Sequence, residues 1–185
     1  MKSIFTRFLV PALILATPSF VLSLYNLTHT EQLQSSDVFR YFGLVNFVLS
    51  ILILLFFSGK YRTLNSVNGN VTFKMIFSYA YRIVVISALY GFGISLVLSY
   101  TFKEENKKLS EIATEMQVKE LVKEKGSISE TDKHDLENRT IETLSNPVTS
   151  SFYYSLSILF FGIFHCLIIS VFWILFKSYP SEIKN

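Results

Sequence analysis

Long runs of apolar residues alternate with polar connections along this chain. A helix that crosses the roughly 30 Å apolar core of a bilayer needs about 20 mainly apolar residues, because an α-helix rises about 1.5 Å per residue. Four runs reach this length with few or no charged residues, at positions 8–27, 38–57, 76–102 and 151–176. The pattern predicts an all-α integral membrane protein with four transmembrane helices.

The first run follows Lys2 and Arg7, as the apolar part of a secretory signal peptide follows basic residues. It stays uncharged from Phe8 to Thr30, which is longer than the apolar part of an ordinary signal peptide, and no convincing cleavage motif is present. We therefore interpret residues 8–27 as a transmembrane helix.

The charge pattern divides the chain into residues 1–102, with three spans, residues 103–146, and residues 147–185, with the fourth span and a short tail. The middle part is rich in charged residues and contains no Phe, Tyr or Trp. Such a change in composition indicates a solvated segment outside the membrane. We expect it to form a charged helical hairpin.

The first half of the hairpin carries a thin apolar stripe at helical spacing, formed by Leu109, Ile112, Ala113 and Met116. We expect the third span to continue outward as this helix, which Gly126 is suited to end. Ser129, followed three residues later by Asp132, is a capping box that begins the second helix. The charged surface is most simply a solvated face, and the thin stripe is where a protein partner would dock.

Arg82 lies in the third apolar run on one helical stripe with Lys74 and Ser78. We expect a lead-in along the membrane surface from the cap residue Thr72, with Arg82 anchoring the helix at the lipid phosphates. An arginine at the bilayer centre would cost about 2.5–3.5 kcal/mol even on a lenient scale. The alternative is a dedicated contact of Arg82 and Lys74 with an anion or a lipid phosphate.

Lysine and arginine are concentrated in the cytoplasmic connections of membrane proteins. Lys2 and Arg7 precede the first span, and Lys60, Arg62 and Lys74 follow the second, whereas the first connection has neither residue type. The sequence therefore predicts that both termini face the cytoplasm and that the hairpin lies on the opposite side.

Small residues recur at four-residue spacing in the third and fourth spans. They are Ser87, Gly91, Ser95 and Ser99 in the third span, and Gly162, Cys166 and Ser170 in the fourth. Small residues let helix backbones approach closely in a membrane. We expect these two ridges to pack the two spans on each other or on another protein. Asn146 and Pro147 are suited to cap and begin the fourth span.

His165 and Asn46 lie near the middle of their spans, with Tyr90 at a similar depth. A buried histidine in a membrane needs a hydrogen-bond partner, and we expect Asn46 or Tyr90 to provide it. A proton relay has little support, since no Asp or Glu occurs within the four runs. We therefore interpret His165 as structural.

The 185 residues are 50% hydrophobic and carry a net charge of +3, with the charges in blocks between the spans. This distribution does not indicate nucleic-acid binding. The histidines fall on separate segments, and the single cysteine excludes an internal disulfide, so the sequence predicts no metal site and no cofactor. No motif pairs a nucleophile with a base, and we expect no enzyme activity.

Four features follow one another: KYR after the second span, NGNVTFKMIFSYAYR before the third, a hairpin broken at EKGSISETD, and SNP before a fourth span with LIIS. This order resembles the four-span bacterial membrane family known as domain of unknown function 4199 (DUF4199). The resemblance covers nearly the whole chain. It implies a Gram-negative inner-membrane protein with a periplasmic hairpin, and it supplies no activity and no functional residues.

These observations favour a non-enzymatic accessory subunit of an envelope complex. Its partners would be membrane lipids and a membrane or periplasmic protein or a second copy of the chain, contacted through the small-residue ridges and the hairpin. The alternative is a small transporter or lipid-binding subunit that arranges Lys74, Arg82 and His165 around a cavity.

Overall fold

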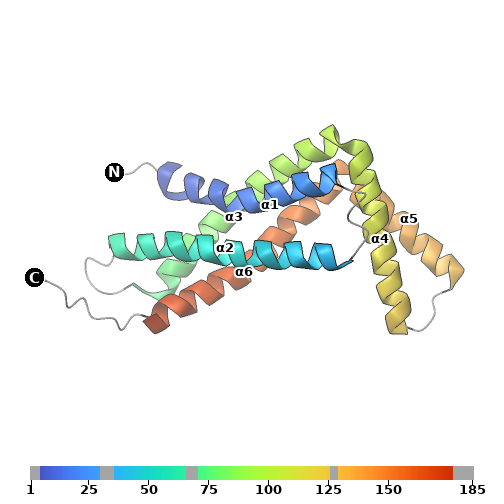
Figure 1. Ribbon diagram of the computed structural model, residues 1–185. Helices are drawn as coiled ribbons and strands as arrows, with labels where there is room; N and C mark the ends of the chain where they lie inside the picture. Colours follow the sequence, from blue (N-terminus) through green and yellow to red (C-terminus); the bar gives the residue numbers. More distant parts are fainter. Residues whose placement is uncertain (1–4, 30–35, 66–70, 126–128, 177–185) are drawn as a thin grey trace, which may run out of the picture.

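The computed structural model describes residues 5–29, 36–65, 71–125 and 129–176, and these form helices without any strand. A π-helical turn, η1 (Phe5–Leu9), leads into the first α-helix. The α-helices in these ranges are α1 (Val10–Thr28), α2 (Ser36–Asn65), α3 (Phe73–Thr101), α4 (Lys103–Lys125), α5 (Glu130–Ser145) and α6 (Pro147–Leu175) (Figure 1). The predicted all-α class is confirmed.

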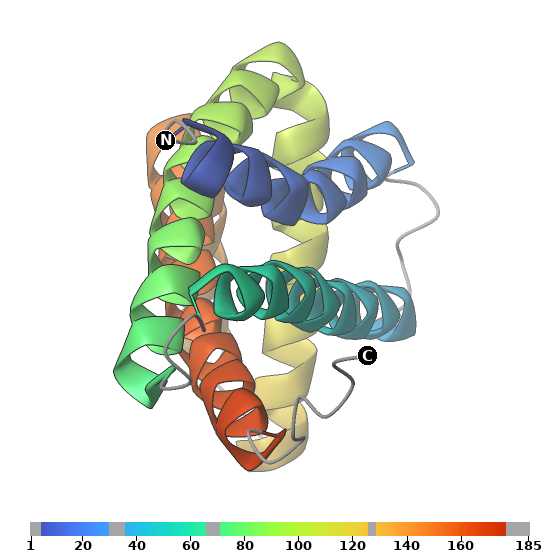
Figure 2. The same cartoon turned by 90° about the vertical axis from the view of Figure 1, so that its left-hand side faces the viewer.

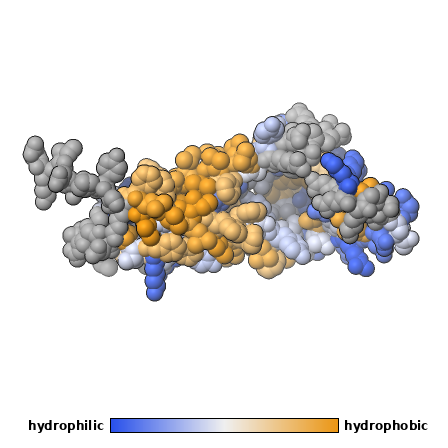
Figure 3. All heavy atoms as spheres, turned by 90° about the horizontal axis from the view of Figure 1, so that it is seen from below, coloured by the Kyte–Doolittle hydropathy of each residue, from blue (hydrophilic) through white to orange (hydrophobic). Residues whose placement is uncertain are grey.

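Four segments of the described chain are long and apolar enough to cross a membrane. They are Thr6–Thr28, Tyr41–Leu64, Phe73–Thr101 and Pro147–Leu175. They form a bundle with the α4–α5 hairpin at one end (Figure 1). Large apolar side chains are exposed along the bundle, as a surface in contact with lipid requires. Hydrophilic residues gather at the hairpin end (Figure 3). The protein is an integral membrane protein.

The predicted caps at the starts of the third and fourth spans are confirmed. Thr72 Oγ1 accepts a hydrogen bond from the Met75 N–H at 3.4 Å, and α3 runs without interruption from Phe73 to Thr101. Asn146 Oδ1 accepts hydrogen bonds from two backbone N–H groups of the first turn of α6, at 3.0 and 3.2 Å. These side chains satisfy backbone donors that a helix end leaves free, so the two spans begin at defined residues.

α3 and α6 make the most extensive contact between two helices in the described chain, and they lie side by side in two views (Figures 1 and 2). A Cβ atom on Gly162 would overlap Val84, and one on Gly91 would lie 2.8 Å from Ile158 Cδ1. Side chains of the facing helix therefore occupy the space that a Cβ atom would need at each glycine. The small-residue ridges pack α3 and α6 on each other, which is the first of the two predicted possibilities.

α2 is held against α6 by Trp173, whose Nε1 donates a hydrogen bond to Ser58 Oγ at 2.9 Å. A Cβ atom on Gly59 would lie only 2.7 Å from Trp173 Cζ2, so glycine leaves the space that the indole ring fills. Arg62 Cζ lies 5.2 Å from the centre of the same ring. The helix α2 thus continues to Asn65, beyond residue 57 where the predicted span ends, and its last turns pack against α6.

The hairpin differs from the sequence expectation in two respects. α4 follows α3 directly, but Phe102 has non-helical backbone angles (φ −113°, ψ 52°), and α4 turns across the end of the bundle instead of continuing the axis of α3 (Figure 1). The buried residues of α4 are Ser110, Thr114 and Val118. The predicted apolar stripe of Leu109, Ile112, Ala113 and Met116 is only partly buried.

Ser110 and Thr114 can be buried because their hydroxyl groups donate to the carbonyls of Asn106 and Ser110 in the same helix, at 2.8 and 2.7 Å. The second predicted helix is confirmed, since Ser129 Oγ accepts a hydrogen bond from the Asp132 N–H at 3.1 Å where α5 begins. The predicted end of the first helix at Gly126 lies outside the described residues.

Candidate functional site

A pocket of about 250 Å³ lies where α1 and α3 begin and α2 approaches its end. Its lining residues are Arg7, Phe8, Tyr61, Lys74, Met75, Ser78, Tyr79 and Arg82. We refer to it as the basic pocket, because three cations line it and no carboxylate does so among the residues that the structure describes.

One face of α3 supplies Lys74, Ser78 and Arg82 to the basic pocket, as their four-residue spacing predicts. Arg7 comes from the turn that precedes α1, across from this face. All three cationic side chains are exposed. The positive charge of the pocket is therefore available to an anion that approaches from outside.

The aromatic rings of the pocket hold the two guanidinium groups in place. Arg7 Cζ and Arg82 Cζ lie 5.6 and 5.8 Å from the centre of the Phe8 ring, and Arg7 Cζ is 5.2 Å from the centre of the Tyr61 ring. Tyr79 stacks on Tyr61 with ring centres 4.1 Å apart, and its hydroxyl donates to the Arg7 carbonyl at 3.3 Å. Two like charges beside one ring repel each other, so an anion between them would lower the energy of this arrangement.

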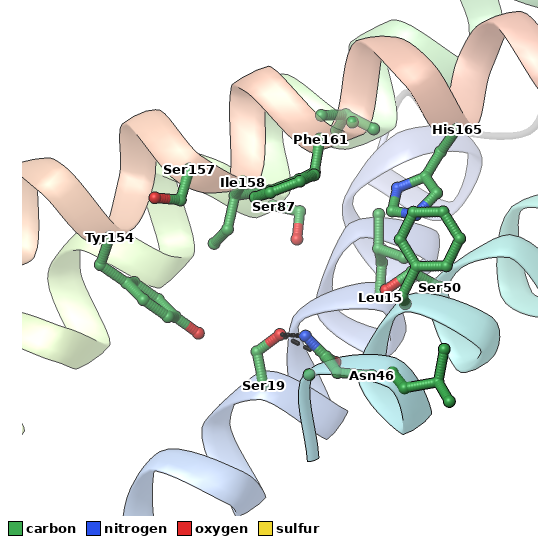
Figure 4. Close-up of a pocket in the computed structure, with 15 residues that line it drawn as sticks. Leu15, Ser19, Asn46, Ser50, Ser87, Tyr154, Ser157, Ile158, Phe161 and His165 are labelled. Carbon is green, nitrogen blue, oxygen red and sulfur yellow. Dashed lines mark hydrogen bonds between the residues drawn. The ribbon is translucent and has the colours of Figure 1, made fainter. Parts of the chain in front are cut away.

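A second pocket, the central pocket, has a volume of about 530 Å³ and lies between α1, α2, α3 and α6 (Figure 4). Its walls are mainly apolar. The polar residues among those that line it are Ser19, Asn46, Ser50, Ser87, Tyr154, Ser157 and His165. None of the lining residues that the structure describes carries a Lys, Arg, Asp or Glu side chain, which distinguishes this pocket from the basic pocket.

His165 is only 7% exposed, and its Nε2 atom has no hydrogen-bond partner among the described residues. Asn46 instead faces α1, where Ser19 Oγ lies 3.0 Å from its Nδ2 atom and 3.1 Å from its Oδ1 atom. The expectation that Asn46 or Tyr90 satisfies the histidine is therefore wrong. The His165 ring contacts Phe47, with ring centres 4.5 Å apart.

The candidate site residues predicted from the sequence lie in three places, which are the basic pocket, the central pocket and the contacts between helices. Lys74 and Arg82 meet at the basic pocket, whereas His165 lies in the central pocket, so the three do not surround one cavity. Ser87 and Gly162 line the central pocket as well.

The remaining small residues serve contacts within the chain. Ser95 Oγ accepts a hydrogen bond from Ser151 Oγ at 3.1 Å, and Gly91 lies against Ile158. Cys166 and Ser170 are fully buried, with Ser170 Oγ donating to the Cys166 carbonyl at 2.6 Å. In the part of the chain described, no group of three or more His, Cys, Asp or Glu residues could hold a metal ion.

Sequence reasoning missed the residues that come from neighbouring helices. From the sequence, Arg7 marks only a basic flank of the first span, and the aromatic residues Phe8, Tyr61 and Tyr79 of the basic pocket gave no signal of their own. Tyr154, whose hydroxyl points into the central pocket toward Ser19 (Figure 4), was not among the candidate site residues predicted from the sequence.

Comparison with known proteins supplies a family. The sequence model of the family described as "Protein of unknown function (DUF4199)" matches residues 9–174, which include all of the hairpin and nearly all of the four spans. No curated protein and no solved structure matches the chain. Because the match covers most of its length, the chain belongs to the DUF4199 family.

Proposed function

We propose that this protein is a non-enzymatic membrane protein that binds the phosphate group of an anionic lipid in the basic pocket. The observation that carries the proposal is the convergence of Arg7, Lys74 and Arg82 from two segments of the chain on one pocket without a carboxylate. A pocket of this kind lacks an internal counter-charge, and a lipid phosphate would supply one.

The chemistry of the side chains fits a phosphate. A guanidinium group presents a planar set of donors that matches two phosphate oxygens, and an ammonium group adds a compact charge. Arg7 and Arg82 provide two such guanidinium groups, held beside the Phe8 ring, and Lys74 provides the ammonium group. The Ser78 hydroxyl is a further donor on the same face of α3.

The position of the pocket also fits a lipid headgroup. It lies at the end of the bundle where the first and third spans begin, and such ends meet the headgroup region of a bilayer. The distribution of Lys and Arg supports an orientation with this end in the cytoplasm. On this proposal the membrane is the bacterial inner membrane, and the α4–α5 hairpin lies in the periplasm.

A second candidate function is that of an accessory subunit. α5 has no buried residue, so the hairpin presents exposed surface to a protein partner or to a second copy of the chain. The small-residue ridges do not support such an interface, since they are used between α3 and α6. A co-purifying partner that is lost when exposed residues of α5 are replaced would favour this function.

The phosphate proposal is tested in nanodiscs made of phosphatidylcholine, with or without added phosphatidylglycerol. We expect phosphatidylglycerol to raise the midpoint of thermal unfolding of the natural protein. The double variant Arg7→Gln/Arg82→Gln should lose this increase, whereas Lys60→Gln, which removes an exposed cation outside the pocket, should keep it. An equal increase in all three proteins would contradict a dedicated phosphate site.

The same experiment separates binding from anchoring. If Arg82 only fixes the depth of α3, the double variant should give less folded protein in either lipid mixture, with an unchanged response to phosphatidylglycerol. That result would reject the lipid-binding proposal in favour of the structural role.

A further inference from the structure

The surroundings of His165 indicate a second binding site. The residue is only 7% exposed, its ring lines the central pocket (Figure 4), and Nε2 has no partner among the described residues. An unsatisfied polar atom in an apolar interior is unfavourable, and such atoms are rare in native proteins. Nε2 is enclosed by protein, with less than 1 Å² of its surface accessible, so a partner in the pocket reaches it only when the imidazole ring turns toward the cavity.

The pocket is larger than a single water molecule would need. Its volume of about 530 Å³ falls within the range of small-molecule sites, roughly 300–1,000 Å³. Leu15, Leu44, Phe47 and Phe161 are among the apolar residues of its walls. An occupant that fills this space must therefore be mainly apolar.

The polar groups that face the pocket are uncharged. They include the hydroxyl groups of Ser50, Ser87 and Tyr154 (Figure 4), and no cation or carboxylate lines the described walls. A charged headgroup would lose its hydration here without gaining a counter-charge. A hydroxyl or carbonyl group, in contrast, can hydrogen-bond to a neutral imidazole and to neighbouring hydroxyl groups.

The pocket opens toward the surrounding lipid. Leu44 on α2 and Phe161 on α6 line it, yet they are 59% and 53% exposed on the apolar outer surface of the bundle. A Cβ atom on Gly43, another lining residue, would meet no atom within 4 Å. A molecule dissolved in the bilayer can therefore enter between α2 and α6.

We propose that the central pocket binds an uncharged, bilayer-soluble amphiphile, and that the His165 ring turns toward the cavity so that Nε2 hydrogen-bonds to the hydroxyl or carbonyl group of this ligand. The apolar body of this ligand lies between α2 and α6. Neutral glycerolipids and isoprenoid quinones both have this chemistry. The site is separate from the basic pocket and does not depend on the proposed function.

The test uses the full-length protein in nanodiscs and native mass spectrometry. Dioctanoylglycerol and decylubiquinone are added in separate experiments, so that a bound adduct identifies which source supplies the ligand. We expect one of the two probes to bind with a stoichiometry of one. Binding of neither probe, or non-saturating binding of both, would overturn the proposal.

Gly43→Leu is the decisive variant, because it places a larger side chain where the structure has open space beside the pocket. Its matched control is Gly93→Leu, since a Cβ atom on Gly93 also meets nothing within 4 Å but Gly93 does not line the pocket. We expect Gly43→Leu to abolish binding and Gly93→Leu to retain it. Equal binding by both variants would show that the probe lies elsewhere.

The role of the histidine is tested separately. His165→Leu should weaken binding about tenfold, as the loss of one buried hydrogen bond predicts, and His165→Gln should recover part of the affinity. Arg82→Gln should leave binding of the probe unchanged, because Arg82 lines the other pocket. Full affinity in His165→Leu would contradict the proposed hydrogen bond.

Discussion

Gly162 of α6 lies directly against Val84 of α3, so closely that a Cβ atom on the glycine would overlap the valine side chain. Both residues also line the central pocket. This contact between the two helices therefore forms part of the wall of the pocket, and the packing of α3 on α6 contributes to its shape.

Replacing Gly162 by alanine should destabilise the protein, because the added methyl group has no space beside Val84. Overpacking of this kind costs about 1–3 kcal/mol. Gly93→Ala is the matched control, since a Cβ atom there meets nothing within 4 Å. Thermal unfolding in detergent would measure the difference, and Val84→Ala should restore part of the stability of the Gly162→Ala variant.

The hydroxyl groups of Ser95 and Ser151, 3.1 Å apart, allow a test in native membranes. Cysteines at these two positions, in a Cys166→Ala background, should form a disulfide under mild oxidation, because their sulfur atoms can approach the required distance of about 2 Å. The pair Ser95→Cys and Ser157→Cys should not. Gel mobility with and without reductant reports the result, and absence of the first cross-link would contradict the packing of α3 on α6.

Ser58→Ala should weaken the contact between α2 and α6, since it removes the acceptor of the Trp173 Nε1 hydrogen bond. Hydrogen bonds between membrane helices contribute about 0.6–2 kcal/mol. The chain contains a single tryptophan, so its fluorescence reports on the surroundings of Trp173. We expect a blue shift of the emission maximum and a lower unfolding temperature.

Ser157→Ala is the matched control for the fluorescence measurement, because the Ser157 hydroxyl donates to the Tyr153 carbonyl in its own helix. An emission spectrum of Ser58→Ala that is identical to that of the natural protein would show that the indole N–H has no partner at Ser58.

The spans and their caps were predictable because they depend on residues close together in the sequence. Apolar length identifies a membrane helix, and a side chain such as Thr72, Ser129 or Asn146 caps the residues that immediately follow it. The packing of α3 on α6 was partly predictable, since small residues recur on one face of each helix. The sequence did not show that these small residues pack α3 on α6 within the chain and not on a partner protein.

The two pockets were not predictable because they depend on which helices become neighbours. Arg7 and Arg82 are far apart in the sequence, and only the packing of α1 on α3 brings both to the Phe8 ring. Asn46 and His165 lie at similar depths, but Asn46 turns toward Ser19. Helical spacing alone does not determine such rotations.

The buried face of α4 was also missed, for a different reason. Hydropathy predicts that Leu109 and Ile112 are more deeply buried than Ser110 and Thr114. Ser110 and Thr114 are nevertheless buried, because their hydroxyl groups donate hydrogen bonds within the helix. Once satisfied in this way, a small polar residue can pack closely against another helix.

The central claim, a lipid phosphate in the basic pocket, is tested most directly by native mass spectrometry of protein extracted from membranes that contain phosphatidylglycerol. The natural protein and Lys60→Gln should retain one anionic lipid per chain. Arg82→Gln should retain about fivefold less, since one basic residue near an anionic lipid contributes about 1 kcal/mol. Equal retention of phosphatidylglycerol by Arg82→Gln and Lys60→Gln would contradict the account.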